Sequence, residues 1–269
     1  MVTHIYGHRG ARGLYPENTL EGFWETLKLP IKGIELDVVV SKDYQLLVSH
    51  EPWMHHLFCT SPNGHLITKD REKQHNIYQM TVHQVQQYDC GKRKHPQFPN
   101  QITFPAYKPT LNEVFKLFSK KNKQLELFLE IKSNPKWYNT YQPKPNRYAE
   151  LVNSFLKSNP FTGTIIIKSF DTNFLNAIYR IDPNYTLGLL VKNTNGVEAN
   201  LKLLNFIPSH YSLFHEYVTS QENEILLANK IELIPWTVNT IENAQQLSDI
   251  GITKIITDYP NRFIRVDGY

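Results

Sequence analysis

The sequence contains little cysteine, with only Cys59 and Cys90 among its 269 residues. Two isolated cysteines provide neither the framework of several disulfides that holds small secreted proteins together nor a Cys-x-x-Cys metal site. They place no limit on the cellular compartment. The fold must therefore depend on a hydrophobic core, which the length of the chain and its 41% of hydrophobic residues can supply.

Long apolar runs and strong net charge are also missing. No stretch approaches the roughly 20 apolar residues of a membrane-spanning helix. Strand-like sequence begins near the first residue and leaves no room for a signal peptide, so we expect a cytoplasmic protein; a leader removed before this methionine would leave no trace in the sequence. The 29 Lys and Arg residues against 25 Asp and Glu give a formal charge of only +4, without a basic run. We therefore expect no nucleic-acid partner, and the sequence does not define an oligomeric state.

Short apolar runs alternate with amphipathic segments along most of the chain, which is typical of repeated strand–helix units. No glycine-rich dinucleotide motif follows the first strand, so a single (β/α)8 TIM-barrel domain over residues 1–269 is favoured over an open doubly wound sheet. Strands are predicted near Ile5 and around Leu213, and at Gly33–Val40, Gln45–Ser49, Leu125–Ile131, Thr164–Ser169, Thr186–Val191, Glu232–Val238 and Lys254–Thr257. Helices are predicted at Leu111–Lys120, Tyr148–Lys157, Asn173–Ile181 and Ile241–Asp249, with Asp171 and Thr240 as N-caps.

The stretch from Glu51 to about Pro109 interrupts this alternation. It is rich in His, Gln, Pro and Asn, so we expect an insertion at about 51–109, after the third strand, with one short helix near Val82–Tyr88. Seven of the eleven histidines lie between His50 and His95. Their spacing matches no zinc signature, which favours a solvated histidine-rich surface over a second metal site.

Charged residues occupy two strands that should be apolar. Strands of a parallel barrel are covered on both faces and normally read as continuous Val, Ile and Leu. Yet "GIELDVVV" contains Glu35 and Asp37, and "LFLEIKS" contains Glu130 and Lys132. Each i, i+2 pair points to one face, which in a closed barrel can be the interior.

Buried carboxylates cost several kcal/mol when they are unpaired, so three of them indicate a divalent cation. Oxygen ligands favour Mg²⁺ or Ca²⁺ over zinc. A structural network of ion pairs is the alternative, and it explains a single such residue better than three on two strands.

Titratable residues also end other strands. His8 ends the first strand, His50 ends "QLLVSH" and Asp258 ends "KIITD". The active sites of barrels of this kind form at the carboxyl ends of the strands. Two imidazoles, an arginine, a lysine and a carboxylate-bound cation suit phosphoryl transfer, in which cations stabilise the phosphate oxygens and histidines act as general base and general acid.

Short motifs in a fixed order carry a family resemblance. They are "GHRG" at 7–10, "PENT" at 16–19, "ELD" at 35–37, "PTLNEV" at 109–114, "EIK" at 130–132, "KSF" at 168–170, "PWTVN" at 235–239 and "TDYP" at 257–260. "HRG" with "PENT" and the two acidic strands is the specific combination. On these motifs, which span nearly the whole chain, the sequence resembles the glycerophosphodiester phosphodiesterases.

The resemblance implies metal-dependent hydrolysis of small-molecule glycerophosphodiesters to glycerol 3-phosphate and an alcohol. It implies Glu35, Asp37 and Glu130 as ligands of one divalent cation, Mg²⁺ or Ca²⁺. It also implies His8 and His50 as the acid–base pair. By similarity to the family, the glycerol moiety supplies the attacking hydroxyl, and water then opens a cyclic phosphate.

The same resemblance implies Arg9 and Lys132 as phosphate contacts, with Trp236 and Phe170 lining the substrate site. Glu17, Asn18 and Glu51 are expected not to touch the substrate but to hold these groups in place by hydrogen bonds. The family often has Asp directly after its second histidine, where this chain has Glu51. The longer side chain can still orient an imidazole or ligate a metal.

Two alternatives keep the barrel and change the function. One is a phosphodiesterase that acts on lysophospholipids, of the lysophospholipase D type, and it calls for an apolar, membrane-seeking surface that the sequence does not show. The other is a barrel that binds phosphodiesters without catalysis. Such a barrel should have lost a catalytic histidine or an acid, and all of the expected positions are intact here.

Overall fold

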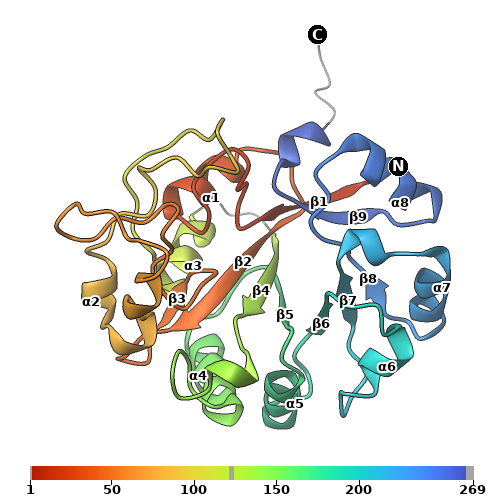
Figure 1. Cartoon of the computed structure of the whole chain (residues 1–269). Coiled ribbons are helices and arrows are strands. Elements are labelled where there is room, and N and C mark those ends of the chain that lie inside the picture. Colours follow the sequence, from red (N-terminus) through yellow and green to blue (C-terminus); the bar gives the residue numbers. More distant parts are fainter. Residues whose placement is uncertain (1, 121–123, 265–269) are drawn as a thin grey trace.

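The computed structural model describes residues 2–120 and 124–264, so the two ends of the predicted domain, residues 1 and 269, lie outside the described residues. Figure 1 shows strands surrounded by helices. The strands are β1 His4–His8, β2 Gly33–Val40, β3 Leu46–Val48, β4 Glu126–Ile131, β5 Thr164–Ser169, β6 Leu187–Val191, β7 His210–Leu213, β8 Glu232–Leu233 and β9 Lys254–Thr257.

Eight of these strands form one parallel sheet in the order β8-β7-β6-β5-β4-β2-β1-β9. Beyond β8, the Val238 amide donates to the Ile256 carbonyl at 2.9 Å, and the Ile256 amide donates to the Pro235 carbonyl at 3.0 Å. These bonds join the segment after β8 to β9, which are the two ends of the sheet, so the barrel is nearly closed. The predicted (β/α)8 fold is confirmed.

Helices cover the outside of the strands. They are α1 Leu20–Thr26, α2 Val82–Val85, α3 Leu111–Ser119, α4 Pro145–Ser158, α5 Thr172–Ile181, α6 Val197–Leu201, α7 Ser220–Ala228 and α8 Ile241–Asp249. Asp171 accepts from the Asn173 amide and Thr240 from the Asn243 amide, so both predicted N-caps are confirmed. None of the helices in the described part of the chain is long and apolar enough to cross a membrane.

Two apolar layers hold the barrel together. The larger layer fills the space between strands and helices. A smaller cluster of buried side chains fills the inside of the strand ring and consists of Tyr6, Phe128, Ile166, Ile234 and Ile256. Side chains two positions apart on a strand point to the same face. The next residue of each strand that faces the interior therefore lies two positions nearer the carboxyl end of the strand.

The third strand in chain order differs from its neighbours. β3 pairs antiparallel with β2, with Val39 opposite Leu47, and stands outside the ring of eight. Only a tight turn separates β2 from β3, in which the Ser41 amide donates to the Gln45 carbonyl at 3.0 Å. A parallel connection needs a crossover of a dozen or more residues, and this link is much shorter. The two strands therefore form an antiparallel hairpin. The eighth strand, predicted as Glu232–Val238, is limited to Glu232–Leu233.

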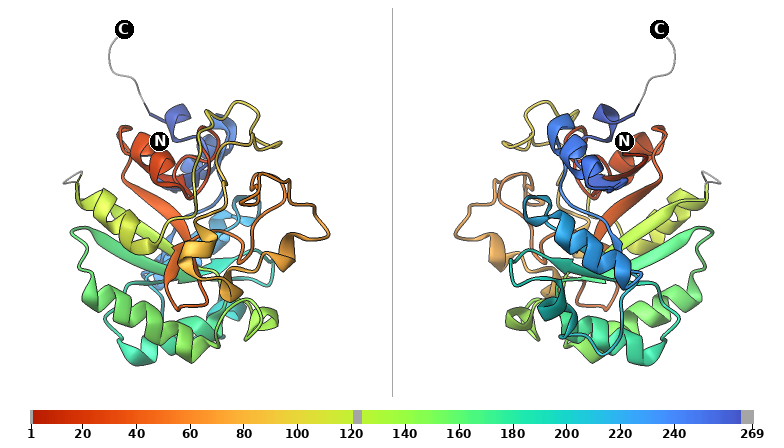
Figure 2. Two further views of the ribbon diagram at one scale, coloured as in Figure 1. Left: turned by 90° about the vertical axis from the view of Figure 1, so that its left-hand side faces the viewer. Right: turned by 90° about the vertical axis from the view of Figure 1, so that its right-hand side faces the viewer.

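The predicted insertion follows β3 and lies beside β2 and β3 in both views (Figures 1 and 2). It contains short 3-10 helices at Glu72–Gln74 and Ile77–Gln79 and the helix α2, which is shorter than predicted. The insertion packs its own apolar cluster against β2 and β3. Cys59 and Cys90 form a disulfide within it. This disulfide was not predicted, because two cysteines 31 residues apart carry no pairing signal in the sequence.

The close packing of β2 leads to a test. A Cβ atom at Gly33 would lie 1.9 Å from the Glu126 carbonyl oxygen of β4, whereas at Gly188 of β6 the nearest atom is the His210 Cβ at 3.2 Å. We expect Gly33→Ala to lower the free energy of unfolding by about 1–3 kcal/mol, because backbone atoms would have to separate. Gly188→Ala is the matched control and should cost less. Equal losses in denaturant titrations would contradict this packing argument.

Candidate active site

A layer of charged side chains lies inside the barrel. It is next to the apolar cluster of Tyr6, Phe128, Ile166, Ile234 and Ile256, on the side of the carboxyl ends of the strands. The strand register pairs His8 with Glu35, Asp37 with Glu130, and Glu130 with Lys168. All of these side chains are buried. The sequence therefore places charge on the carboxyl end of the strand ring, where enzymes of this fold carry out their chemistry.

Three carboxylates meet in this layer. Glu35, Asp37 and Glu130 each have an oxygen within 4.8 Å of the other two. Among the described residues, Glu35 Oε1 and Asp37 Oδ1 have no hydrogen-bond partner. The ammonium groups near them are at ion-pair distance only, with Lys168 Nζ 3.5 Å from Glu35 Oε1 and Lys132 Nζ 3.7 Å from Asp37 Oδ1. Three buried carboxylates, two of which have an oxygen without a hydrogen bond, fit a hard divalent cation.

The electrostatics of the cluster favour the binding of a further positive charge. Burial raises the pKa of Glu35 to about 7; Lys168 opposes this rise, and Asp37 and Glu130 add to it. Burial would also raise the pKa of Asp37, but Arg9 holds it well below its usual range. The Glu35 anion is thus destabilised by burial and by the neighbouring carboxylates, which a cation between them would relieve.

Two histidines reach the same end of the barrel, and each is paired with a carboxylate. His8 Nδ1 lies 2.6 Å from Asp258 Oδ1, and His50 Nδ1 forms a short hydrogen bond with Glu51 Oε1. Burial lowers the pKa of His8 to about 4, although Asp258 opposes this. His8 is therefore a neutral imidazole at neutral pH, with its Nδ1 proton donated to Asp258 and its Nε2 free to accept a proton.

The "GHRG" turn brings Arg9 over the carboxylates. Arg9 and Gly10 both have positive φ, 51° and 91°, and a Cβ at Gly7 would lie 1.9 Å from the Gly10 carbonyl oxygen. The Arg9 backbone amide donates to Glu35 Oε2 at 3.1 Å, and its Nη1 donates to Glu17 Oε1 at 3.0 Å. The Arg9 Nε also lies 3.2 Å from Asp37 Oδ2. The turn thus lets one residue contact the acidic cluster through both its backbone and its side chain.

Asn18 supports Asp37 from the same loop. Its Nδ2 donates to Asp37 Oδ2 at 2.9 Å, and its Oδ1 accepts from the Asp37 amide at 3.4 Å. The residue has a positive φ of 57°, which asparagine tolerates better than most residues. The side-chain amide therefore fixes one oxygen of Asp37 and leaves the other without a hydrogen bond.

Aromatic residues line one side of this end of the barrel. The rings of Phe170 and Trp236 lie 5.6 Å apart, and Trp236 lies 5.6 Å from Phe214. Trp236 Nε1 donates to the Ser212 carbonyl at 2.9 Å, which fixes the indole. Lys132 Nζ lies 5.9 Å from the centre of the Phe170 ring. The aromatic groups are thus next to the cations rather than in a separate region.

Several polar groups of the site were not among the predicted site residues. Arg12 Nε and Asn239 Nδ2 donate to the two oxygens of Asp258 at 3.0 and 2.8 Å, and Lys108 Nζ donates to Ser49 Oγ at 2.8 Å. Lys168 could have been found, because it interrupts the apolar strand "TIIIKS" in the way that Glu35 interrupts its own. Arg12 and Lys108 lie in loops, where no periodicity marks them.

Two histidines with carboxylate partners, a buried acidic cluster and several cations at the carboxyl end of a (β/α)8 barrel define a hydrolase of phosphoric esters. Within that class the chain belongs to the glycerophosphoryl diester phosphodiesterase family, whose sequence profile matches residues 8–262. The chain is thus a member of a family of enzymes that hydrolyse glycerophosphodiesters.

Individual proteins agree with this membership. The chain is 27% identical to a glycerophosphodiester phosphodiesterase of Caldanaerobacter subterraneus subsp. tengcongensis, over 99% of this chain and 98% of the other. A crystal structure from Silicibacter pomeroyi assigned to the glycerophosphoryl diester phosphodiesterases is 25% identical, with a TM-score of 0.85 over 97% of this chain and 91% of that one. An Oleispira antarctica phosphodiesterase, solved in complex with the product sn-glycerol-3-phosphate, is 20% identical and shares the fold, with a TM-score of 0.77 over 97% and 95%.

The Asn18–Asp37 contact generates a prediction for the metal-free protein. Asn18→Asp keeps the shape but places a carboxylate against Asp37 Oδ2 in a buried position, so we expect a loss of about 3 kcal/mol or more in unfolding free energy. Asn18→Gly is the control, because it removes the hydrogen bond and suits the positive φ; it should cost about 1–3 kcal/mol. Denaturant titration in a chelator measures both. If the Asn18→Asp variant were as stable as the Asn18→Gly variant, the side chains at positions 18 and 37 would not be in contact.

Proposed function

We propose that this protein hydrolyses glycerophosphodiesters with one divalent cation and two histidines, and releases glycerol 3-phosphate and an alcohol. The observation that carries the proposal is the buried cluster of Glu35, Asp37 and Glu130, two of whose oxygens lack a hydrogen bond, beside His8. Family membership supplies the reaction class, and the geometry supports the division of roles among the residues.

Glu35, Asp37 and Glu130 would hold the cation. Mg²⁺ and Ca²⁺ both accept carboxylate oxygens, and the cluster does not choose between them. When bound, such an ion supplies Lewis acidity and charge neutralisation to phosphate oxygens. The neighbouring side chains of Arg9 and Lys132 add positive charge on the same side, so they are suited to contact the phosphate oxygens.

His8 and His50 would move the protons. The neutral His8, with Asp258 on Nδ1, is suited to remove the proton of a glycerol hydroxyl at Nε2 while that oxygen attacks phosphorus. The bond from phosphorus to the alcohol oxygen then breaks, and the alcohol leaves with a proton donated by His50. Water opens the cyclic phosphate with the two proton transfers reversed. Glu51 and Asp258 act as positioning residues for the imidazoles.

The aromatic side chains Phe170 and Trp236 would form a wall for the glycerol or the leaving alcohol. They lie beside Lys132, one of the proposed phosphate contacts. The Oleispira antarctica relative, which binds sn-glycerol-3-phosphate, supports glycerol 3-phosphate as the product here.

Two predictions on organisation remain proposals. One is that residues 1–269 form a single domain in which 51–109 is an inserted subdomain. The other is a cytoplasmic location. The disulfide between Cys59 and Cys90 counts against that location, because such bonds persist mainly in oxidising compartments.

The proposed function is tested by measuring the release of glycerol 3-phosphate from glycerophosphocholine and glycerophosphoethanolamine with Mg²⁺, with Ca²⁺ and with EDTA. We expect metal-dependent release, and a fall in kcat of about 100-fold or more for His8→Ala and His50→Ala. His65→Ala, an exposed histidine of the insertion, is the matched control and should keep the wild-type rate.

Full activity in EDTA with metal-stripped protein, or an unchanged rate in both active-site variants, would contradict the proposal. Lysophosphatidylcholine is assayed in parallel. Hydrolysis of that substrate alone would replace the glycerophosphodiester assignment by the lysophospholipid alternative.

A further inference from the structure

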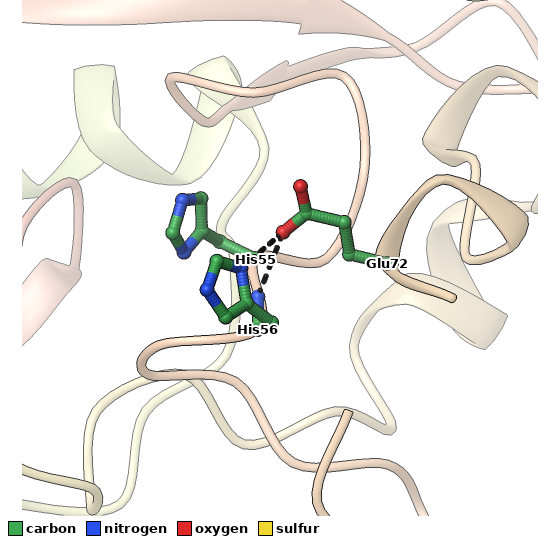
Figure 3. Close-up of side chains that lie close together, drawn as sticks. All are labelled: His55, His56 and Glu72. Carbon is green, nitrogen blue, oxygen red and sulfur yellow. Dashed lines mark hydrogen bonds and ion pairs between the residues drawn. The ribbon is translucent and has the colours of Figure 1, made fainter. Parts of the chain in front are cut away.

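A second group of potential metal ligands lies in the insertion, apart from the carboxylate cluster in the barrel. His55 and His56 follow β3 by a few residues, and Glu72 begins the 3-10 helix at Glu72–Gln74. Each of the three offers one ligand atom, and these atoms lie within 4.8 Å of one another. Figure 3 shows the two imidazole rings side by side with the Glu72 carboxylate next to them.

Hydrogen bonds prepare His56 and Glu72 for a cation. His56 Nδ1 lies 2.6 Å from Glu72 Oε2, and the His56 backbone amide donates to the same oxygen at 3.2 Å. A cation can replace the proton between His56 Nδ1 and Glu72 Oε2, so that both atoms become ligands. Metal binding releases such protons, because the ligand atoms must be deprotonated.

His55 completes the group. Its ring stacks on that of His56, with the centroids 4.7 Å apart, and its Nδ1 accepts from the Leu57 amide at 3.1 Å. This nitrogen carries no proton of its own, and a cation that binds it would replace the hydrogen bond from the Leu57 amide. Burial lowers the pKa of His55, while Glu51 and Glu72 oppose this. Burial thus favours the neutral form of the ring, which is the form that binds metals.

We propose that His55, His56 and Glu72 form a binding site for a transition-metal dication such as Zn²⁺, separate from the site for the hard cation in the barrel. Two imidazole nitrogens and one carboxylate oxygen are the donor set that zinc-like ions prefer, whereas the barrel cluster offers oxygen alone. The two sites therefore select different ions.

The site needs only side-chain movement to close. Zinc–nitrogen bonds of about 2.0–2.1 Å place tetrahedral ligand atoms roughly 3.4 Å apart, closer than the present limit of 4.8 Å. His56 and Glu72 are partly exposed, with side-chain exposures of 21% and 12%, so their χ angles can adjust, and water can supply the fourth ligand. Arg93 donates to the His56 carbonyl at 2.6 Å. That nearby positive charge makes the Glu72 carboxylate necessary for binding a dication.

A metal here would hold the insertion together near the active site. It would join residues 55–56 to Glu72, close to the disulfide of Cys59 and Cys90. His55 is only four positions after Glu51, the partner of His50. We therefore assign the site a structural role that fixes the segment leading out of the active site.

The test is titration of the full-length protein with Zn²⁺ and with Co²⁺ in the presence of excess Mg²⁺, followed by calorimetry and by the visible absorption of Co²⁺. We expect one strongly bound ion per chain, and binding at least about 10-fold weaker in His56→Ala and in Glu72→Gln. The near-isosteric Glu72→Gln keeps the proposal testable if His56→Ala is poorly folded.

Two control variants localise the ion. His65→Ala, in the same insertion, and Glu130→Gln, in the barrel cluster, should both bind Zn²⁺ as the wild type does. Unchanged affinity in Glu72→Gln, loss of binding in Glu130→Gln, or no bound ion in the wild type would overturn the proposal. None of these outcomes depends on phosphodiesterase activity, so failure of this site and failure of the proposed function are distinguishable.

Discussion

The site depends on one electrostatic constraint: three carboxylates are buried side by side on two neighbouring strands of a barrel. Glu35, Asp37 and Glu130 cannot all be stable anions in that position without positive charge between or around them. Arg9, Lys132 and Lys168 supply part of that charge, yet two carboxylate oxygens still lack hydrogen bonds. A bound dication would satisfy the remainder, and it would place the positive charge where a phosphate group can share it.

The surrounding loops position groups that contact the three carboxylates or the neighbouring His8. The "GHRG" turn requires positive φ at Arg9 and Gly10, and through that turn the chain delivers both a backbone amide and a guanidinium to the acidic layer. Asn18 fixes Asp37 from the following loop. His8 stands in the same layer and is held by Asp258, which Arg12 and Asn239 hold in turn. Positioning of this kind lets an imidazole act without first rearranging.

Much of the fold could be predicted because the hydrophobic pattern reports it directly. The bounds of β2, β5 and β9 were predicted to the residue, since each contains a short run rich in Val, Ile or Leu. The pairing direction of β3 was not predictable in this way, because the pattern marks a strand but not its partner. The disulfide of the insertion was equally hidden, since pairing depends on where the loops lie in space.

For the site, the charged residues within strands were visible because they violate the apolar pattern. Residues on loops were visible only where a family motif covers them, as for Glu17 and Asn18, and Arg12 and Lys108 had neither signal. The histidine-rich insertion shows a further limit. Its spacing matches no zinc signature, and only the fold brings Glu72 to His55 and His56.

The most direct test of this account is calorimetric titration of the metal-stripped protein with Ca²⁺ and with Mg²⁺, compared between the wild type and Glu130→Gln. We expect one hard ion to bind to the wild type, and we expect the glutamine variant to bind it far more weakly while retaining its fold. Equal binding by both proteins, or no binding by the wild type at millimolar concentrations of either ion, would contradict the claim that the buried carboxylates exist to hold a cation.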